Sequence, residues 1–467
     1  MDSKLVIRWT LGLIGTLVLA RLISLGLYPL YDTTEARYGE MARIMFETQN
    51  WVTPMFDYNV PFWGKPPMQT WLSAASFELF GVSEFSARLP HFLCGLGTLI
   101  AVYWWVKRYI SLFHAIISVL VLTSTLGFIL ASGMVMTDSI LLLAVTGAMI
   151  SFWCCYREND RSVAGHVFFA SLALGMLVKG PVAIVIVGIA LVSWSIWQRC
   201  FVAAIKSLPW ISGLVIFLVL ALPWYIWAEV RSPGFLNYFI WGEHVQRFLV
   251  SGWQGDLYGS AHDEPRGMIW LLWLGAAFPW SFYLVLKLIL TLKDKQRQAS
   301  ENPMISYLVC WMIAPMLLFT MAGNILPAYV LPGFSAMAVL VSSQMKSPSI
   351  LLANALVSSV VFIVLIGIVL SGQFDKSSEA SLLGVNRNFP QDDQLYYWHK
   401  RPFSAQFYSK GQAQLLQDKE QLKRLLLTKT PFDLALLNQD LVDIKPLVES
   451  HCQLVNRSTI RQLYYCR

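Results

Sequence analysis

Carboxylates and cations are concentrated in residues 28–87, a long polar segment between two apolar ones. Asp32, Glu35 and Arg37 come first, where the apolar residues adopt the i, i+3, i+4, i+7 spacing of an amphipathic helix. One reading makes Asp32 an N-cap and Glu35 its capping-box partner. The other makes one of these carboxylates a catalytic group, which acts as a base or orients an acceptor. Both readings can hold together, because one residue can cap while the other reacts.

Lys65 lies later in the same stretch, in the sequence FWGKPP. Two prolines impose an extended backbone there, and the aromatic rings suit a membrane interface. A lone lysine in this setting either extends toward lipid headgroups or binds one phosphate as a point charge. Lys65 and Arg37 are therefore candidates for contacts with a phosphate.

Two further candidates lie at the ends of apolar segments. Asp138, in MTDS, is an N-cap or a site residue. Lys179 precedes Gly-Pro, where it either caps helix carbonyls or binds phosphate. Both residues are predicted at the same side of the membrane as the stretch 28–87.

The last candidates lie in two later motifs, FIWGEHVQRF and NILPAYVLP. Glu243 and Arg247 are four residues apart, which favours a helical salt bridge or a shared role at a phosphate. His244, with His262 and a carboxylate, is a candidate for a divalent cation, although the spacing matches no common metal motif. Tyr329 either hydrogen-bonds a phosphate or belongs to an aromatic belt.

The elements that must position these residues are membrane spans. Of the 467 residues, 56% are hydrophobic and 13% are charged, against about 25% charged in soluble domains. The mean hydropathy is +0.53. The net charge of +7 comes largely from short loops between spans, which argues for membrane topology and against nucleic acid. About eleven spans are predicted, at residues 6–27, 88–106, 112–131, 138–156, 164–178, 180–197, 209–228, 268–290, 304–323, 327–343 and 349–371.

The loops follow the positive-inside rule if the N-terminus is cytoplasmic. Residues 28–87, residues 229–267 and the tail then lie on the outer face. The chain divides into a membrane domain, 1–371, and an outer domain, 372–467. In the tail we predict strands at 395–398, 404–408, 432–437 and 460–466, and a helix at 412–427, which together make a small α/β domain. A disulfide between Cys452 and Cys466 is chemically allowed outside the cytoplasm.

The positive-inside rule predicts few cations on the outer face. Their presence there favours a functional reason for some of them. A polyprenyl phosphate sugar would suit them: the lipid tail lies between helices, the phosphate meets lysine and arginine, and an acceptor arrives from outside. A lipid-sugar flippase is the alternative. Such a transporter would need a charge path through the membrane midplane, and the predicted spans do not provide one.

At these residues the chain resembles the GT-C superfamily of polytopic glycosyltransferases, which contains the aminoarabinose transferases of lipid A and the protein O-mannosyltransferases. The resemblance covers roughly residues 5–345, in the motifs TEARYGEMAR, WVTP, GKPP, EFSARLP, MTDSILL, VKGP, YFIWGEHVQRF and LPAYVLP. Aminoarabinose transferases have an acidic residue where this chain has Gly64 and an Asp-Glu pair where it has Thr34-Glu35. They are also longer, by about two spans, and have a different tail.

The resemblance implies an all-α polytopic membrane protein with a C-terminal α/β domain on the periplasmic side of a bacterial inner membrane. It implies inverting transfer of a monosaccharide from undecaprenyl phosphate to lipid A, another glycan or a protein. Glu35, or else Asp32, would be the catalytic carboxylate. Lys65, Arg247 and Tyr329 would contact the donor phosphate. No cofactor is implied.

Overall fold

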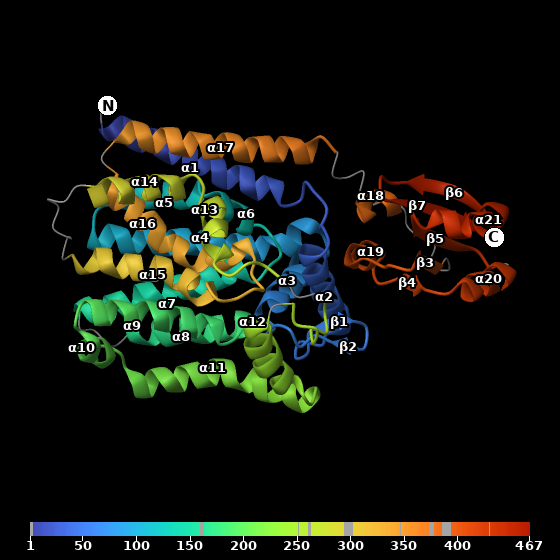
Figure 1. Ribbon diagram of the computed structural model, residues 1–467, viewed down its shortest axis with the longest axis horizontal. Coiled ribbons are helices and arrows are strands. Elements are labelled where there is room, and N and C mark those ends of the chain that lie inside the picture. The colour runs from blue at the N-terminus through green and yellow to red at the C-terminus, as the bar shows by residue number, and fades with distance from the viewer. Residues whose placement is uncertain are drawn as a thin grey trace.

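The computed structural model describes residues 3–158, 163–250, 252–259, 263–293, 302–345, 347–372, 378–384, 394–428 and 430–467. It consists of a bundle of roughly parallel helices and a small C-terminal sheet domain at one end of the bundle (Figure 1). We call the end of the bundle next to that sheet domain the domain end.

The bundle is made of apolar helices, some of them in pairs. They are α1 (Ser3–Ser24), α4 (Glu84–Tyr109), α5 (Leu112–Thr123), α6 (Leu126–Ala131), α7 (Asp138–Glu158), α8 (Val163–Lys179), α9 (Val182–Trp197), α10 (Phe201–Lys206), α11 (Trp210–Arg231), α13 (Met268–Ala276), α14 (Trp280–Lys293), α15 (Pro303–Phe319), η2 (Pro327–Gly333), α16 (Phe334–Gln344) and α17 (Pro348–Leu370). Five helices in the described part of the chain are long and apolar enough to cross a membrane, or six if the bent pair α13 and α14 counts as one span. The outward faces of α11 and α17 are apolar and exposed, as lipid contact requires.

Each predicted apolar span coincides with one of these helices or with an adjacent pair, and three of them are interrupted. The span 112–131 is broken between α5 and α6, and 268–290 bends by 114° between α13 and α14. The span 327–343 opens with the 3₁₀ turn η2, which carries Pro327 and Pro332. A proline lacks the N–H that an α-helix needs, so the tighter turn precedes the regular helix. The number of crossings stays a prediction.

Short elements cover the domain end of the bundle. They are α2 (Thr34–Thr48), β1 (Met55–Asp57), β2 (Val60–Pro61), α3 (Met68–Phe80), the wide π-helix η1 (Asn237–Gln246) and α12 (Arg247–Leu249). The predicted amphipathic helix is α2, but ten of its fifteen residues are buried against α3, β1 and the C-terminal domain. It is a packed element and does not lie free on a membrane.

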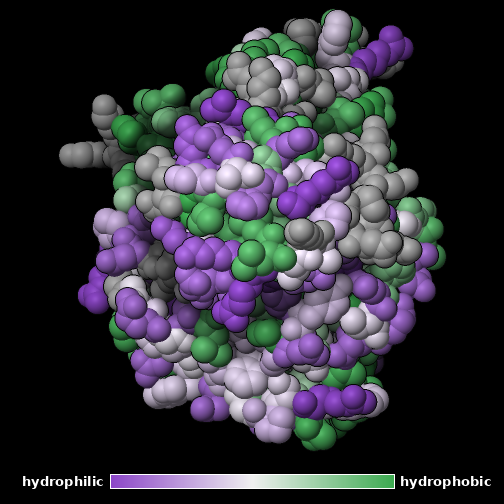
Figure 2. Space-filling view, turned by 90° about the vertical axis from the view of Figure 1, so that its right-hand side faces the viewer, coloured by the Kyte–Doolittle hydropathy of each residue, from purple (hydrophilic) through white to green (hydrophobic). Residues whose placement is uncertain are grey.

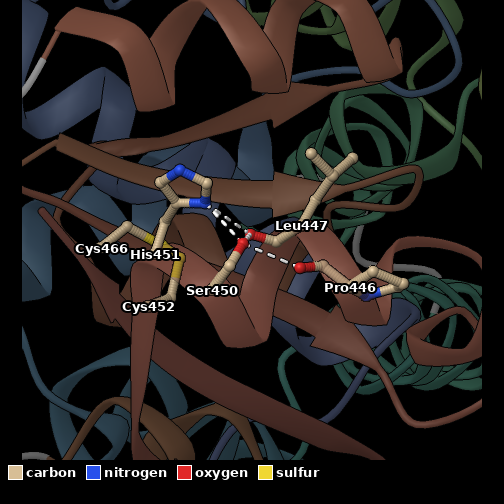
Figure 3. Close-up of a disulfide and its surroundings, with 6 residues drawn as sticks. All are labelled: Pro446, Leu447, Ser450, His451, Cys452 and Cys466. Atoms are coloured by element: carbon tan, nitrogen blue, oxygen red, sulfur yellow. Dashed lines mark hydrogen bonds between the residues drawn. A yellow bond between two sulfur atoms is a disulfide. The ribbon is translucent and has the colours of Figure 1, made fainter.

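The C-terminal domain is an α/β unit, as predicted. Its elements are α18 (Glu379–Leu383), β3 (Gln394–Trp398), α19 (Phe403–Tyr408), β4 (Ala413–Leu416), α20 (Lys419–Thr428), β5 (Phe432–Leu437), α21 (Leu441–His451), β6 (Cys452–Arg457) and β7 (Arg461–Cys466). The sheet order is β4-β3-β5-β7-β6, with β3 parallel to β4 and β5, and β7 antiparallel to β5 and β6. Cys452 and Cys466, for which the sequence allows a disulfide, form one between β6 and β7 (Figure 3).

Two predictions in this domain were wrong. Residues 404–408 form helix α19 and no strand, because a carboxylate from far away, Asp32, accepts the N–H groups of Phe403 and Ser404 at its start. Residues 412–427 do not form one helix: Ala413–Leu416 pairs with β3 as strand β4, and α20 begins only at Lys419. In both places contacts with distant segments overrode the local pattern.

The molecular surface at this end differs from the lipid-facing sides of the bundle. Figure 2 looks onto the C-terminal domain, where the surface is largely hydrophilic with apolar residues interspersed. A hydrophilic end beyond an apolar bundle is what a membrane protein with one water-exposed domain presents.

Candidate active site

A cavity of about 620 Å³ lies at the domain end, where loops meet the bundle. Seven of the ten predicted site residues line it: Arg37, Lys65, Asp138, Lys179, Glu243, Arg247 and Tyr329. The bundle contributes an apolar part of the lining, with Leu130 of α6, Ala276 of α13 and Leu331 of η2 among its residues. A charged surface and an apolar surface thus share one cavity.

Two cations share one carboxylate in this cavity. Lys65 Nζ lies 3.1 Å from Glu243 Oε2, and Arg247 Nη1 lies 2.8 Å from the same oxygen. Asp256 adds a second carboxylate 3.3 Å from Arg247 Nη2. Burial raises the pKa of Glu243, but Lys65 and Arg247 outweigh burial and hold it below its usual range. Glu243 is therefore an ionised partner of both cations and is poorly suited to act as a base.

The loop that carries Lys65 is fixed from both sides. The Tyr258 hydroxyl accepts from Trp63 N at 2.9 Å and donates to Pro61 O at 2.8 Å. The Trp63 indole donates to Ser232 Oγ at 2.8 Å. The predicted i, i+4 ion pair is present between Glu243 of η1 and Arg247 of α12, but Lys65 joins it from a segment far away in the sequence.

Asp138 and Lys179 form a second, buried ion pair. Lys179 Nζ lies 2.6 Å from Asp138 Oδ1 and 4.0 Å from the centroid of the Tyr329 ring. Asp138 is the first residue of α7, not the residue before it, so the predicted N-cap is replaced by a lysine contact. Gly180 follows with φ +69°, and a Cβ there would lie 2.5 Å from the Phe239 ring. Glycine thus allows η1 to pack on the turn that carries Lys179.

Arg37 differs from the other cavity cations. In the described parts of the chain, no carboxylate forms an ion pair with it, whereas Lys65, Lys179 and Arg247 each have one. Its Nη1 donates to Tyr258 O at 3.3 Å, its Nε is buried without a partner, and its guanidinium lies 5.1 Å from the Tyr38 ring centroid. Arg37 is the cation best placed to receive a further anion.

Glu35 and Asp32, the predicted catalytic carboxylates, do not line the cavity. Glu35 accepts from Arg88 Nε at 3.0 Å and Arg88 Nη2 at 2.9 Å, and also from Val135 N. Arg88 is fully buried, so this pair ties α2 to α4 inside the protein. The predicted capping box is absent too, because Thr33 precedes α2 and makes no side-chain cap.

Asp32 instead contacts the C-terminal domain. Its carboxylate accepts from Phe403 N at 2.9 Å and from the backbone and hydroxyl of Ser404. Both of the carboxylates that sequence reasoning placed at the reacting centre thus hold structural elements together.

His244 lies beside the cavity and does not line it. Its Nδ1 is 2.7 Å from Phe239 O and its Nε2 is 3.2 Å from Lys179 O. Burial lowers the pKa of His244, whereas the two carbonyl oxygens that face its ring nitrogens act in the opposite direction. His262 lies outside the described residues. Within the described ranges, no three His, Cys, Asp or Glu side chains gather as a set of metal ligands.

Sequence reasoning assigned no role to several of the residues that line the cavity. Asp256, Tyr258, Asn324 and Phe403 line it together with the predicted set. Asp256 and Tyr258 occur in WQGDLYG, directly after the motif that holds Arg247, so their proximity along the chain was a usable signal. Phe403 had none, because it comes from the C-terminal domain. Gly64 and Thr34, the two departures from the aminoarabinose transferase pattern, also line the cavity.

The overall fold matches that of a known structure. The chain superposes on the crystal structure of ArnT from Cupriavidus metallidurans bound to undecaprenyl phosphate with a TM-score of 0.80, over 98% of both chains, at 19% identity. The apo form of the same protein gives a TM-score of 0.74. The chain is thus a multi-pass membrane protein with a GT-C fold and a C-terminal sheet domain.

The sequence relatives agree with the fold. Residues 11–239 match the sequence model of the dolichyl-phosphate-mannose-protein mannosyltransferase family. The undecaprenyl phosphate-alpha-4-amino-4-deoxy-L-arabinose arabinosyl transferase of Erwinia tasmaniensis is 32% identical over 329 residues, which are 69% of this chain and 56% of that protein. The transferase of that name from Shewanella sediminis is 28% identical, over 71% of this chain and 58% of that protein. The chain spans less than two thirds of the length of these relatives. Together with the fold, these matches confirm the resemblance to glycosyltransferases of this superfamily.

Proposed function

We propose that the protein is an inverting glycosyltransferase that moves a monosaccharide from a polyprenyl phosphate donor to an acceptor on the outer face of a bacterial inner membrane. The observation that carries this proposal is the convergence of Lys65, Arg247, Arg37 and Tyr329 in one cavity that also has an apolar lining. Transfer from a phosphate needs charge stabilisation of the leaving group more than it needs protonation. The apolar residues from α6, α13 and η2 would hold the start of the prenyl chain.

The charge balance of the cavity supports an anionic ligand. Four cations line it (Arg37, Lys65, Lys179 and Arg247) against three carboxylates (Asp138, Glu243 and Asp256), so 4 − 3 leaves one net positive charge. A sugar phosphodiester carries one negative charge and would neutralise it. Undecaprenyl phosphate, the ligand of the solved relative, is the lipid carrier that we propose for the sugar of the donor.

The ion pairs of the cavity carboxylates indicate which class of sugar the donor carries. The named relatives transfer an amino sugar, which is cationic at neutral pH. Each of the three cavity carboxylates here is within 3.3 Å of a cation nitrogen, so none is free for an ammonium group. Gly64 and Thr34 stand where the aminoarabinose transferases have acidic residues. A neutral sugar therefore suits this cavity better than an amino sugar.

The reacting carboxylate, if the acceptor is a hydroxyl, would be Asp138 and not Glu35 or Asp32. Asp138 lines the cavity and pairs with Lys179, whereas the other two cavity carboxylates, Glu243 and Asp256, share Arg247 at the proposed phosphate site. If the acceptor is an ionised phosphate, no base is required. Lipid A, another glycan and a protein are the acceptor classes.

The charge pattern and the disulfide support one orientation of the chain in the membrane. The helix ends and turns opposite the domain end (Figure 1) carry Lys107, Arg108, Arg157, Arg199 and Lys206, and basic residues are typical of the cytoplasmic side. The Cys452–Cys466 disulfide fits an oxidising compartment such as the periplasm. The N-terminus would then be cytoplasmic, and the cavity and the C-terminal domain periplasmic.

The test is mass spectrometry of envelope lipids and glycans from a deletion strain, in which one neutral monosaccharide should be missing. The wild-type gene should restore it. Lys65→Ala should not, because it removes a cation from the phosphate site while its partner Glu243 keeps Arg247. An unchanged envelope, or full restoration by Lys65→Ala, would contradict the proposal. A flippase, the second candidate, would move the intact lipid-linked sugar across proteoliposomes without releasing undecaprenyl phosphate.

A further inference from the structure

The C-terminal domain reaches into the cavity through one ring. Phe403, the first residue of α19, lines the cavity and packs edge-on against Phe56 of β1, with 5.1 Å between ring centroids. Phe56 lies 5.0 Å from Tyr258, and Tyr258 lies 4.7 Å from Phe62. We call these four rings the aromatic wall. Phe62, Tyr258 and Phe403 line the cavity. The four rings come from both long loops and from the C-terminal domain, so the wall is complete only when the domain is docked.

Polar contacts fix where Phe403 sits. Asp32 accepts from the backbone N–H of Phe403 at 2.9 Å, and it also accepts from Ser404. Arg401, two residues earlier, forms an ion pair with Asp57 of β1. The backbone that carries the ring is therefore held on both sides by residues of the first loop.

The other end of α19 is held as firmly. The Tyr408 hydroxyl donates to Glu84 Oε1 at 2.9 Å and accepts from Leu30 N at 2.7 Å. Phe407 lies 6.3 Å from Phe77 of α3, between ring centroids. With both ends bound to the membrane domain, α19 is a fixed part of the cavity rim.

We propose that the C-terminal domain supplies the acceptor-side wall of the cavity, with Phe403 as a specificity-determining residue and Asp32 as the positioning residue that holds it. This inference rests on the proposed transferase function. The cations and the apolar lining of the membrane domain serve the donor. The domain lies beyond one end of the bundle (Figure 1). An acceptor that arrives from that side meets Phe403 at the cavity. Phe403 is half-buried, so one part of the ring is packed while another part offers the cavity a flat surface against which an acceptor is oriented.

The first test compares Phe403→Ala with Phe403→Tyr in the complemented deletion strain, together with binding of undecaprenyl phosphate to the purified full chain. Phe403→Ala should lower the amount of transferred sugar by about tenfold, because a poorly oriented acceptor reacts slowly. Undecaprenyl phosphate binding should stay at the wild-type level, and Phe403→Tyr should retain transfer. Leu427→Ala, at a residue 79% exposed on α20 of the same domain, is the matched control and should change nothing.

Wild-type transfer by Phe403→Ala would overturn the proposal. So would loss of undecaprenyl phosphate binding in that variant, because the ring would then serve the donor. If the wild-type gene itself restores no sugar, the proposed function fails before this inference is reached. The two failures are therefore distinguishable.

The second test addresses docking without touching the cavity lining. Asp57→Arg places two cations together and should reduce transfer, whereas the charge-swapped double variant Asp57→Arg, Arg401→Asp should recover most of it. The Cys452–Cys466 mobility shift on a non-reducing gel reports that the domain itself is folded in each variant. Full transfer by Asp57→Arg, or no recovery in the double variant with a folded domain, would overturn the positioning role of docking.

Discussion

Replacing Glu35 with glutamine separates a structural role from a catalytic one. The change removes the charge that balances Arg88 and keeps the size of the side chain. Arg88 is fully buried, and its other N–H groups donate to the carbonyls of Leu25, Tyr28 and Pro29 at 2.7–2.9 Å. The guanidinium cannot move toward water without breaking these bonds, so the lost charge is not replaced by solvent.

The size of the destabilisation by Glu35→Gln follows from the burial of the ion pair between Arg88 and Glu35. Removing one partner of a buried ion pair costs about 3–5 kcal/mol, because the other charge is left uncompensated. Glutamine still offers one acceptor oxygen to Arg88, so the low end of that range, about 3 kcal/mol, is expected. Glu47 provides a matched control on the same helix: its carboxylate pairs with Arg43 at 2.6 Å, but its side chain is 50% exposed. Glu47→Gln should therefore cost at most about 1 kcal/mol.

The assay is thermal unfolding of the detergent-solubilised wild type and both variants, followed as the fraction that stays monodisperse after heating. Glu35→Gln should unfold at a clearly lower temperature than Glu47→Gln, and its transfer in cells should fall in proportion to the amount of folded protein. A Glu35→Gln protein with wild-type thermal stability and no transfer would refute this reasoning. Glu35 would then be the catalytic carboxylate that the sequence pattern allowed.

Three further predictions concern other charged or covalent contacts. Asp138→Asn leaves Lys179 buried without its carboxylate and should lower the unfolding temperature. The double variant Asp138→Leu, Lys179→Met should restore stability but not transfer. Unchanged stability in Asp138→Asn would contradict this prediction. The pKa of Glu243 lies below its ordinary value of 4.5, so its contribution to stability is full above pH 4.5 and is lost as the pH falls through the lowered pKa. The stability difference between wild type and Glu243→Gln should therefore be constant from neutral pH down to 4.5 and shrink only below it; a difference that shrinks at higher pH would contradict the lowered pKa. Cys452→Ser should abolish the non-reducing mobility shift. It should also destabilise the C-terminal domain by about 3 kcal/mol, the value expected for a disulfide whose cysteines are 14 residues apart. An unchanged mobility shift would mean that the bond does not form.

The sequence by itself determined the membrane class of the protein and the location of nearly every bundle helix. Apolar runs reveal spans because an apolar side chain must face lipid or the core wherever the chain folds. It also identified seven residues that line one cavity, because a cation at the membrane surface, such as Lys65, stands out against an apolar background. The interruptions of three spans were harder to see, because hydropathy averages over a break of a few residues.

The roles of the acidic residues were decided by tertiary structure alone. From the local sequence, Asp32 and Glu35 could equally be a catalytic pair or structural residues. Their partners, Ser404 and Arg88, come from distant segments, and these contacts decide in favour of a structural role. The same is true of α19, whose start is capped by Asp32 and whose residues look strand-like alone. A carboxylate is a base, a cap or half of an ion pair according to which group lies within 3 Å of it. That distance is set by how the chain packs and not by the order of its residues.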